Sequence, residues 1–380
     1  MLNKFSIRSI GLLLLLSSLW AEAKQPLYFG HTETILSTAL NEERILSVKL
    51  PQGYEDDIKA SYPVFYTLDG QTHFRRVAGT LEWLSDTSQT IPKHIVVGIH
   101  SEHPHRMRDS QVIAKDEDTP PTADAFLTFL SDELIPYIDK TYRTAPHKIL
   151  AGHSAYARFA LYAYGQERSP FDAYILMSPA VPESNEDLIR FTLAQAKKMK
   201  SKQASDSFLF MALGYEPDLQ SNVDILHKAL SKNSKNNSAW EVQSYPKENH
   251  MSLPSKTLHN AMRSIAESQG WAVPTNVTRK NAKAIVKHYK NLSKKLGKTV
   301  EPNPMVFVNV AWEGINGADF DRAEDMLNTA LKLYPEDAWL YNHLASSYEF
   351  SKQLKKAEET QIIAIALAKK QKETDWLKRF

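Results

Sequence analysis

Residues 151–162, AGHSAYARFALY, place a serine in a Gly-X-Ser turn between a short apolar run and a helical pattern. A serine hydroxyl can attack an acyl carbon when a histidine accepts its proton, a carboxylate orients that histidine and N–H groups stabilise the oxyanion. In a nucleophile elbow, the serine occupies a strained turn between strand and helix, and the next residue supplies one N–H donor. Ser154 is therefore the candidate nucleophile, and Ala155 carries the candidate donor.

The candidate base for Ser154 lies almost a hundred residues later. His250 stands in YPKENHMSLP (245–254), before a predicted helix, where the chain order serine, acid, histidine places the base. A lone histidine is commonly structural, so its position in this order is what indicates catalysis. The second oxyanion donor should come from the loop LDGQ (68–71), and we assign it to the backbone N–H of Gln71.

The candidate acid should follow the apolar run SFLFMALG (207–214). The next residues, GYEPD (214–218), offer two carboxylates: Glu216 is favoured and Asp218 is the alternative. A carboxylate after a strand is also a common loop residue, so position alone does not show whether Glu216 is the triad acid or an ordinary loop residue.

Strands and helices must alternate along the chain to position these groups. The helix pattern is clearest over residues 123–142, with apolar residues at helical spacing and Asp124 in the first turn. Such alternation predicts a mainly parallel sheet with helices on both faces, where the chemistry collects at the carboxyl ends of the strands. The predicted strands are residues 43–51, 62–70, 93–100, 148–154, 173–180 and 207–214.

The N-terminal residues read as an export signal. Lys4 and Arg8 precede an apolar run, and Ala21-Glu22-Ala23 places small residues at the positions that a signal peptidase inspects. We predict a signal peptide over residues 1–23, cleaved after Ala23, and a periplasmic or secreted protein. The run is short for a membrane span and no other stretch approaches about 20 apolar residues, so we expect no membrane span in the mature chain.

Composition excludes several classes of protein. The 380 residues contain no cysteine, which excludes disulfides, thiolate metal sites and lipid attachment through Cys. The 46 basic and 44 acidic residues give a formal net charge of +2, which argues against nucleic acid as a partner. The length favours two domains, and we place them at residues 24–268 and 269–380.

The second predicted domain is helical and carries a repeat. Small, aromatic and proline positions at a 34-residue period resemble tetratricopeptide repeats, in which small residues let two helices approach closely. Two interpretations stay open: an appendage that stabilises the first domain or a homodimer, and a groove that binds a protein partner. The repeated pairs are Ala323 and Ala357, Ala330 and Ala364, Phe307 and Tyr341, Val310 and Leu344, Ala311 and Ala345, and Phe320 and Leu354, with Pro335 closing the first unit.

A resemblance to a known family covers residues 30–265. The succession ILSTALNEERILSVKLPQGY, YPVFYTLDGQ, IPKHIVVGIH, FLTFLSDELIPYIDKTYRT, KILAGHS, FDAYILMSPA and NHMSLP resembles the family of enterochelin esterases, esterase D and feruloyl esterases. The resemblance implies the α/β-hydrolase fold and matches Ser154 to the family's nucleophile, His250 to its histidine and Glu216 to its acid. It also matches Asp69 to Gln71 with the oxyanion loop, so we expect Asp69 and Gly70 to border the substrate.

The segment HRMRD (105–109) matches a family segment beside the active site. Arg106 and Arg108 could hold an anionic or catechol-bearing substrate, or the carboxylate that hydrolysis releases. The structural alternative for Arg108 is a pair with Asp109 that fixes the shape of the loop.

Two departures from the family pattern concern the pocket. The family usually continues its elbow as Ser-X-Gly-Gly, whereas Tyr156 stands two residues after the serine in this chain. We predict that its ring lies against neighbouring helices or at the rim of the substrate pocket, where it would contact substrate. The segment SPAVPESNED (178–187) also lacks the aromatic residues that often line the family's site.

Two functions follow from these residues. The first is a periplasmic serine esterase that forms an acyl-enzyme on Ser154, acts on a small ester such as a siderophore ester, and needs no metal or organic cofactor. Acyl transfer to an acceptor other than water belongs to the same class. The second is a non-catalytic hydrolase-fold protein that binds a partner through its helical tail.

Overall fold

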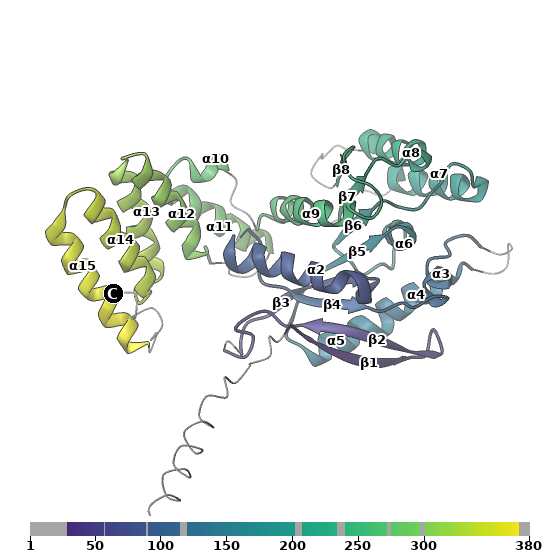
Figure 1. The fold of residues 1–380 in the computed structure, drawn as a ribbon, viewed down its shortest axis with the longest axis horizontal. Helices are drawn as coiled ribbons and strands as arrows, with labels where there is room; N and C mark the ends of the chain where they lie inside the picture. Colours follow the sequence, from purple (N-terminus) through teal and green to yellow (C-terminus); the bar gives the residue numbers. More distant parts are fainter. Residues whose placement is uncertain are drawn as a thin grey trace, which may run out of the picture. The chain divides into compact units, whose positions relative to one another are not determined.

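The computed structural model describes residues 29–56, 58–88, 90–114, 120–201, 207–233, 240–271, 275–296 and 301–371. The predicted signal peptide and its cleavage site lie outside these ranges. Within them, eight strands form one sheet in the order β1-β2-β4-β3-β5-β6-β7-β8 (Figure 1). The strands are β1 (His31–Ser37), β2 (Glu42–Lys49), β3 (Tyr62–Leu68), β4 (Ile95–Ile99), β5 (Thr144–His153), β6 (Ala173–Met177), β7 (Phe208–Leu213) and β8 (Trp240–Ser244).

The direction of the strands confirms the predicted fold class. β1 pairs with β2 and β2 with β4 in antiparallel fashion, and every other neighbouring pair is parallel. The central strands β3, β4, β6 and β7 are buried at every position, as strands covered on both faces must be. The chain therefore has an α/β fold with a mainly parallel sheet, and each of the six predicted strands is present.

Helices cover both faces of this sheet (Figure 1). On one face, α2 (Gly70–Glu82) and α9 (Leu253–Gln269) share an apolar cluster with alternate strand residues such as Phe65 and Ile149. The neighbouring residues Tyr66 and Leu150 point to the other face, because successive side chains of a strand alternate. Helices on that face are α4 (Thr122–Thr128), η3 (Phe129–Leu134), α5 (Ile135–Thr141), α6 (Ala155–Tyr164), α7 (Glu186–Ser201) and α8 (Pro217–Asn233).

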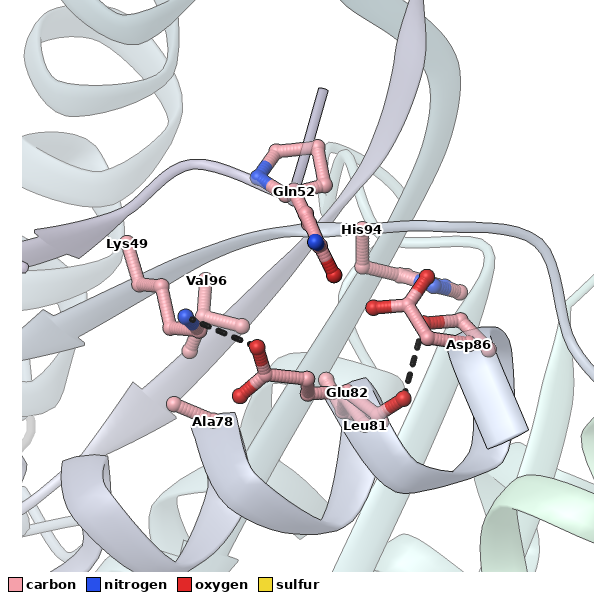
Figure 2. Close-up of a pocket in the computed structure, with 10 residues that line it drawn as sticks. Lys49, Gln52, Ala78, Leu81, Glu82, Asp86, His94 and Val96 are labelled. Atoms are coloured by element: carbon pink, nitrogen blue, oxygen red, sulfur yellow. Dashed lines mark hydrogen bonds and ion pairs between the residues drawn. The ribbon is translucent and has the colours of Figure 1, made fainter. Parts of the chain in front are cut away.

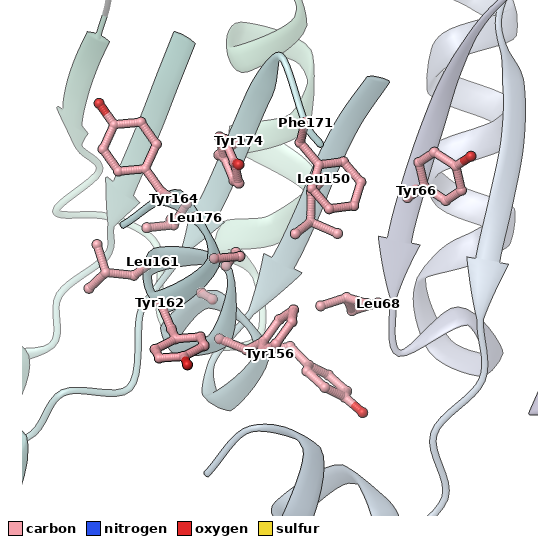
Figure 3. Close-up of a cluster of buried hydrophobic side chains, with 14 of the residues drawn as sticks. Tyr66, Leu68, Leu150, Tyr156, Leu161, Tyr162, Tyr164, Phe171, Tyr174 and Leu176 are labelled. Atoms are coloured by element: carbon pink, nitrogen blue, oxygen red, sulfur yellow. The ribbon is translucent and has the colours of Figure 1, made fainter. Parts of the chain in front are cut away.

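Several aromatic side chains pack together in the core on the α6 face (Figure 3). The ring of Phe171 meets those of Tyr66 and Tyr174 edge-on, with centroids 5.8 and 5.9 Å apart. Tyr164 of α6 meets Tyr174 of β6 in the same way at 5.3 Å. Edge-to-face pairs at these distances add to the free energy gained by burial, so the Tyr164–Tyr174 pair helps to hold α6 against β6, the neighbour of the strand that precedes the elbow.

The described residues from 275 onward are helical: α10 (Thr275–Thr278), α11 (Ala282–Leu296), α12 (Pro304–Asn316), α13 (Phe320–Leu333), α14 (Ala338–Phe350) and α15 (Leu354–Lys370). They have apolar clusters of their own, and the larger one contains the predicted positions Phe307, Ala323 and Leu344. α14 begins 34 residues after α12 (338 − 304), and α15 begins 34 residues after α13 (354 − 320). Two helical hairpins thus follow the predicted period, while the tetratricopeptide assignment and the domain boundaries stay predictions.

The two hairpin turns share an unusual backbone. Ala318 and Lys352 lie 34 residues apart and have φ angles of 58° and 64°, in the left-handed region. A residue with a Cβ pays about 1–2 kcal/mol there, whereas glycine adopts it freely at an entropic cost of about 0.5–1 kcal/mol. Ala318→Gly is therefore expected to raise the free energy of unfolding by about 0.5–1 kcal/mol, measured by urea unfolding of the full chain.

The matched control is Ala366→Gly, at an exposed position inside α15. This glycine should lower the stability by about 1 kcal/mol, because it increases the backbone entropy of the unfolded chain without relieving strain. Equal effects of the two substitutions would show that the turn at Ala318 stores no strain.

Candidate active site

Ser154 lies at the junction of β5 and α6 in a backbone conformation that few residues adopt. Its φ of 60° and ψ of −121° fit the strained turn of a nucleophile elbow. Gly152 permits this turn, since a Cβ at that position would lie 2.2 Å from the carbonyl oxygen of Tyr156. The glycine of the Gly-X-Ser motif is thus required by close backbone approach.

Main-chain hydrogen bonds hold the elbow on both sides. The Ser154 N–H donates to Met177 O at 2.9 Å, and the Ser154 carbonyl accepts from the Ala180 N–H at 3.1 Å. Ala155 is the first residue of α6, where backbone N–H groups have no partner within the helix. Its N–H therefore suits the predicted role of oxyanion donor, and Ser154 itself is partly exposed.

Glu216 and His250 are hydrogen-bonded to each other. His250 Nδ1 lies 2.5 Å from Glu216 Oε1, and the two residues follow β7 and β8 at the carboxyl edge of the sheet. The alternative acid, Asp218, is exposed in the first turn of α8. Because Nδ1 faces the carboxylate, Nε2 is the nitrogen left to act as a base, which is the arrangement that a triad requires.

Ser178 is a residue of this site that the sequence analysis missed. Its hydroxyl donates to Glu216 Oε2, and the Gly214 N–H donates to the same oxygen at 3.2 Å. Burial opposes ionisation of Glu216, but hydrogen bonds from His250, Ser178 and Gly214 outweigh it and lower the pKa of the carboxyl group. Glu216 is thus held as a carboxylate in one orientation.

His153 brings the elbow close to the candidate base, His250. His153 directly precedes Ser154, and its ring centroid lies 4.5 Å from that of His250. Within the described part of the chain, no hydrogen bond joins the Ser154 hydroxyl to the His250 imidazole. Catalytic hydrogen bonds are often long without substrate and tighten in the complex, so this geometry is compatible with a triad.

The predicted oxyanion loop opens α2 next to this site. Asp69 has a left-handed φ of 52°, and Gly70 packs so closely on β4 that a Cβ would lie 2.5 Å from the Gly98 carbonyl carbon. Gln71 lies in the first turn of α2, so its N–H has no helical acceptor. The Gln71 side chain donates to Ser101 O at 2.8 Å and accepts from the Ser101 N–H at 3.1 Å. The loop is therefore tied to the segment after β4.

Arg106 joins three parts of the site. It belongs to α3 (His105–Asp109), and its Nε lies 2.9 and 3.0 Å from the two carboxylate oxygens of Asp69. Its Nη2 donates to His153 O at 3.3 Å. Burial raises the pKa of Asp69 although Arg106 opposes this shift. A quarter of the Arg106 side chain remains exposed. Substrate binding by Arg106, Asp69 and Gly70 stays a prediction.

Arg108 is occupied by carboxylates. It donates to Glu42 through Nη1 at 2.9 Å and Nη2 at 2.6 Å, and its Nη2 reaches Asp109 Oδ1 at 2.8 Å. These hydrogen bonds are the largest cause that lowers the pKa of Glu42 to about 2. The geometry matches the structural alternative for Arg108, in which a pair with Asp109 fixes the loop.

Tyr156 lies in the core and not at the rim of a pocket. Its side chain is 0% exposed, with the ring centroid 5.7 Å from that of Phe126 in α4, and Figure 3 shows it within the buried cluster. Its hydroxyl donates to Ser101 Oγ at 2.5 Å and lies 3.3 Å from Asp109 Oδ2. A buried side chain offers no surface to a ligand, so the predicted contact of Tyr156 with substrate is wrong. The ring packs against a neighbouring helix, which was the other predicted place for it.

The comparison with protein families decides what this arrangement belongs to. The chain matches the family Esterase, described as "Putative esterase", over residues 37–289. It belongs to this esterase family. A comparison with curated proteins gives no match.

Solved structures share the fold of this esterase. An IroE-like serine hydrolase from Shewanella oneidensis is 24% identical over 80% of this chain and 99% of its own, with a TM-score of 0.62. A protein from Capnocytophaga ochracea is 18% identical over 88% of this chain and 93% of its own, with the same TM-score of 0.62. The siderophore hydrolase EstB from Aspergillus nidulans is 20% identical over 66% of this chain and 98% of its own, with a TM-score of 0.52.

Two pockets of the esterase contain none of the predicted site residues. One, of about 10 Å³, lies at the amino end of β4 and is lined by residues that include Lys49, Glu82, Asp86 and His94 (Figure 2). The other, of about 500 Å³, is lined by α12 and α14 residues that include Trp339. In the described ranges, no group of three or more acidic or histidine side chains is placed to hold a metal. No described helix is long and apolar enough to cross a membrane.

Proposed function

We propose that this esterase hydrolyses a small acyl ester through an acyl-enzyme on Ser154. The observation that supports this role most directly is the bond from His250 Nδ1 to Glu216 beside a serine in an elbow conformation. In the proposed reaction, His250 Nε2 takes the proton of the Ser154 hydroxyl as its oxygen attacks the ester carbon. The backbone N–H groups of Ala155 and Gln71 stabilise the oxyanion.

The reaction then releases first the alcohol and afterwards the acid. The protonated His250 gives its proton to the leaving alcohol as the ester bond breaks, which leaves the acyl group on Ser154. His250 then takes a proton from water, the hydroxide attacks the acyl carbon, and His250 returns the proton to the serine oxygen as the acid leaves. Glu216 stays ionised throughout and stabilises the imidazolium.

A siderophore ester is the substrate class that we propose within this activity. One structure with the same fold is named a siderophore hydrolase, and the partly exposed Arg106 guanidinium suits an anionic or catechol group. We also propose export to the periplasm, on the N-terminal signal pattern, and a supporting or partner-binding role for the repeated hairpins.

A covalent probe tests the proposed chemistry. Purified protein treated with a fluorophosphonate should be labelled at Ser154, whereas Ser154→Ala should stay unlabelled because it lacks the attacking oxygen. Asp218→Asn is the matched control and should be labelled at the parent rate, since this exposed carboxylate does not contact His250.

The same proteins should be assayed with a short-chain nitrophenyl ester. If the parent is neither labelled nor active, the esterase proposal fails and the non-catalytic alternative gains support. Labelling of a residue other than Ser154 would leave a hydrolase but overturn the assignment of its nucleophile.

A further inference from the structure

Three histidine rings lie next to one another near the proposed nucleophile, with His153 in contact with both His250 and His73. His250 is partly exposed, with 38% of its side chain accessible, while His153 and His73 are buried. Ring centroids lie 4.5 Å apart for His250 and His153, and 5.5 Å apart for His153 and His73. The middle ring thus fills the space between α2 and the loop that carries the base.

The middle histidine makes one directed contact with that loop. His153 Nε2 lies 2.8 Å from the carbonyl oxygen of His250. A carbonyl only accepts hydrogen bonds, so Nε2 carries the proton and His153 donates. The loop is therefore anchored at the residue that bears the proposed base.

The surroundings of His153 keep its ring neutral. Burial, then the nearby charge of His250, lower the pKa of His153 to about 4, with further repulsion from Arg76 and Arg106. His73 faces it on one side, and Arg76 donates to His73 Nδ1 at 2.9 Å. A neutral ring in one tautomer is a fixed donor over the pH range in which a histidine base works.

We propose that His153 is a positioning residue for His250, holding the main chain of the base while Glu216 holds its ring. This inference rests on the proposed esterase function. The two bonds act on different parts of His250: Glu216 binds Nδ1 and sets the tautomer, whereas His153 binds the carbonyl and sets where the Cα lies. A base fixed at both points presents Nε2 to Ser154 without a search through other orientations.

The link also explains why the residue before the nucleophile carries a side chain of this kind. His153 ends β5, and its own carbonyl accepts from Arg106 Nη2. A single residue thus connects the elbow, the arginine helix α3 and the histidine loop. An apolar residue at position 153 would fill the same space but leave the His250 carbonyl without this donor.

The test compares His153→Phe with His94→Phe. Phenylalanine keeps a buried ring and removes the donor, and misplacement of a base by about 1 Å lowers rates by up to about 100-fold. His153→Phe should therefore lower kcat for a nitrophenyl ester by about 10- to 100-fold with KM little changed, and shift the pH profile of kcat/KM. His94 is a matched control, because it is also a buried histidine whose pKa burial lowers to about 4, and it lies at the amino ends of the parallel strands, whereas His153 lies at their carboxyl ends.

The control separates positioning from general loss of stability. His94→Phe should keep the parent kcat and pH profile even if its melting temperature falls. His153→Gln places an amide N–H near the position of Nε2 and should recover about tenfold of the lost rate. Equal losses of kcat in the two phenylalanine variants, or parent kinetics for His153→Phe, would overturn the inference.

A second pair covers a phenylalanine variant that does not fold. His153→Asn and His153→Gln carry the same amide, but only glutamine reaches the His250 carbonyl, so asparagine should be about tenfold slower. Equal kcat values for this pair would overturn the inference. A parent enzyme without turnover would overturn the esterase proposal and this inference together, whereas an active parent with unaffected His153 variants would overturn only the latter.

Discussion

Replacing Ser154 with alanine is expected to lower kcat for ester hydrolysis by about 10⁶-fold, and Glu216→Gln by about 10⁴-fold. The serine supplies the oxygen that forms the acyl-enzyme, so its loss removes the covalent route altogether. The glutamine amide can donate to His250 Nδ1, which would favour the tautomer with the proton on Nε2 and abolish the base. The substitution also removes the negative charge that stabilises the imidazolium in the transition state.

The double variant Ser154→Ala/Glu216→Gln is the more stringent measurement. Residues that act as a unit have effects that do not add, so the double variant should be no slower than Ser154→Ala alone. Asp218→Asn, the matched carboxamide substitution at the exposed neighbour, should keep the parent kcat. A parent-like Glu216→Gln together with an inactive Asp218→Asn would assign the acid to the other carboxylate.

Lowering the pH from 7 to 5 is expected to reduce the free energy of unfolding by about 6 kcal/mol. Burial lowers the pKa of His94 and His153 to about 4 and that of His73 to about 3, against about 6.5 in an unfolded chain. Between these values the unfolded state binds protons that the folded state does not. Stability is therefore full above pH 6.5 and falls as the pH drops towards 4, by about 2 kcal/mol for each histidine between pH 7 and 5.

Urea unfolding at the two pH values checks this expectation. His94→Phe removes one of the three groups, so the difference between pH 7 and pH 5 should shrink by about 2 kcal/mol. His259→Phe, at an exposed position of α9, is the matched control and should keep the parent difference. A parent stability that is the same at both pH values would contradict the burial of these rings.

The central part of the fold could be predicted from the sequence because its strands are buried on both faces. Continuous apolar runs mark β3, β4, β6 and β7, and the elbow follows the run of β5. The strands β1 and β8 were not predicted. β1 alternates half-buried with exposed residues and β8 is nowhere fully buried, so both lie at sheet edges where the apolar signal is weak.

The candidate site also contains residues that the sequence predicts and residues that only the structure shows. Chain order predicts where an acid and a base stand, but only folding shows that Glu216 and not Asp218 reaches His250. The contributions of Ser178 and His153 could not be inferred, because hydrogen bonds between distant segments leave no local pattern. For Tyr156, all ten residues of α6 are buried, so no amphipathic pattern indicated which way its ring points.

The tyrosine of the elbow has a consequence for how selective the enzyme can be. Tyr156 joins Ser101 and Asp109, and Asp109 is in turn paired with the buried Arg44 of β2. The α3 segment that carries Arg106 is therefore held against β2 and α6 through Asp109. If Arg106 contacts the substrate as predicted, a segment held in this way loses little entropy when the ligand binds, but it also adapts poorly to a ligand of another shape. Discrimination among esters would then rest on exclusion by a rigid template.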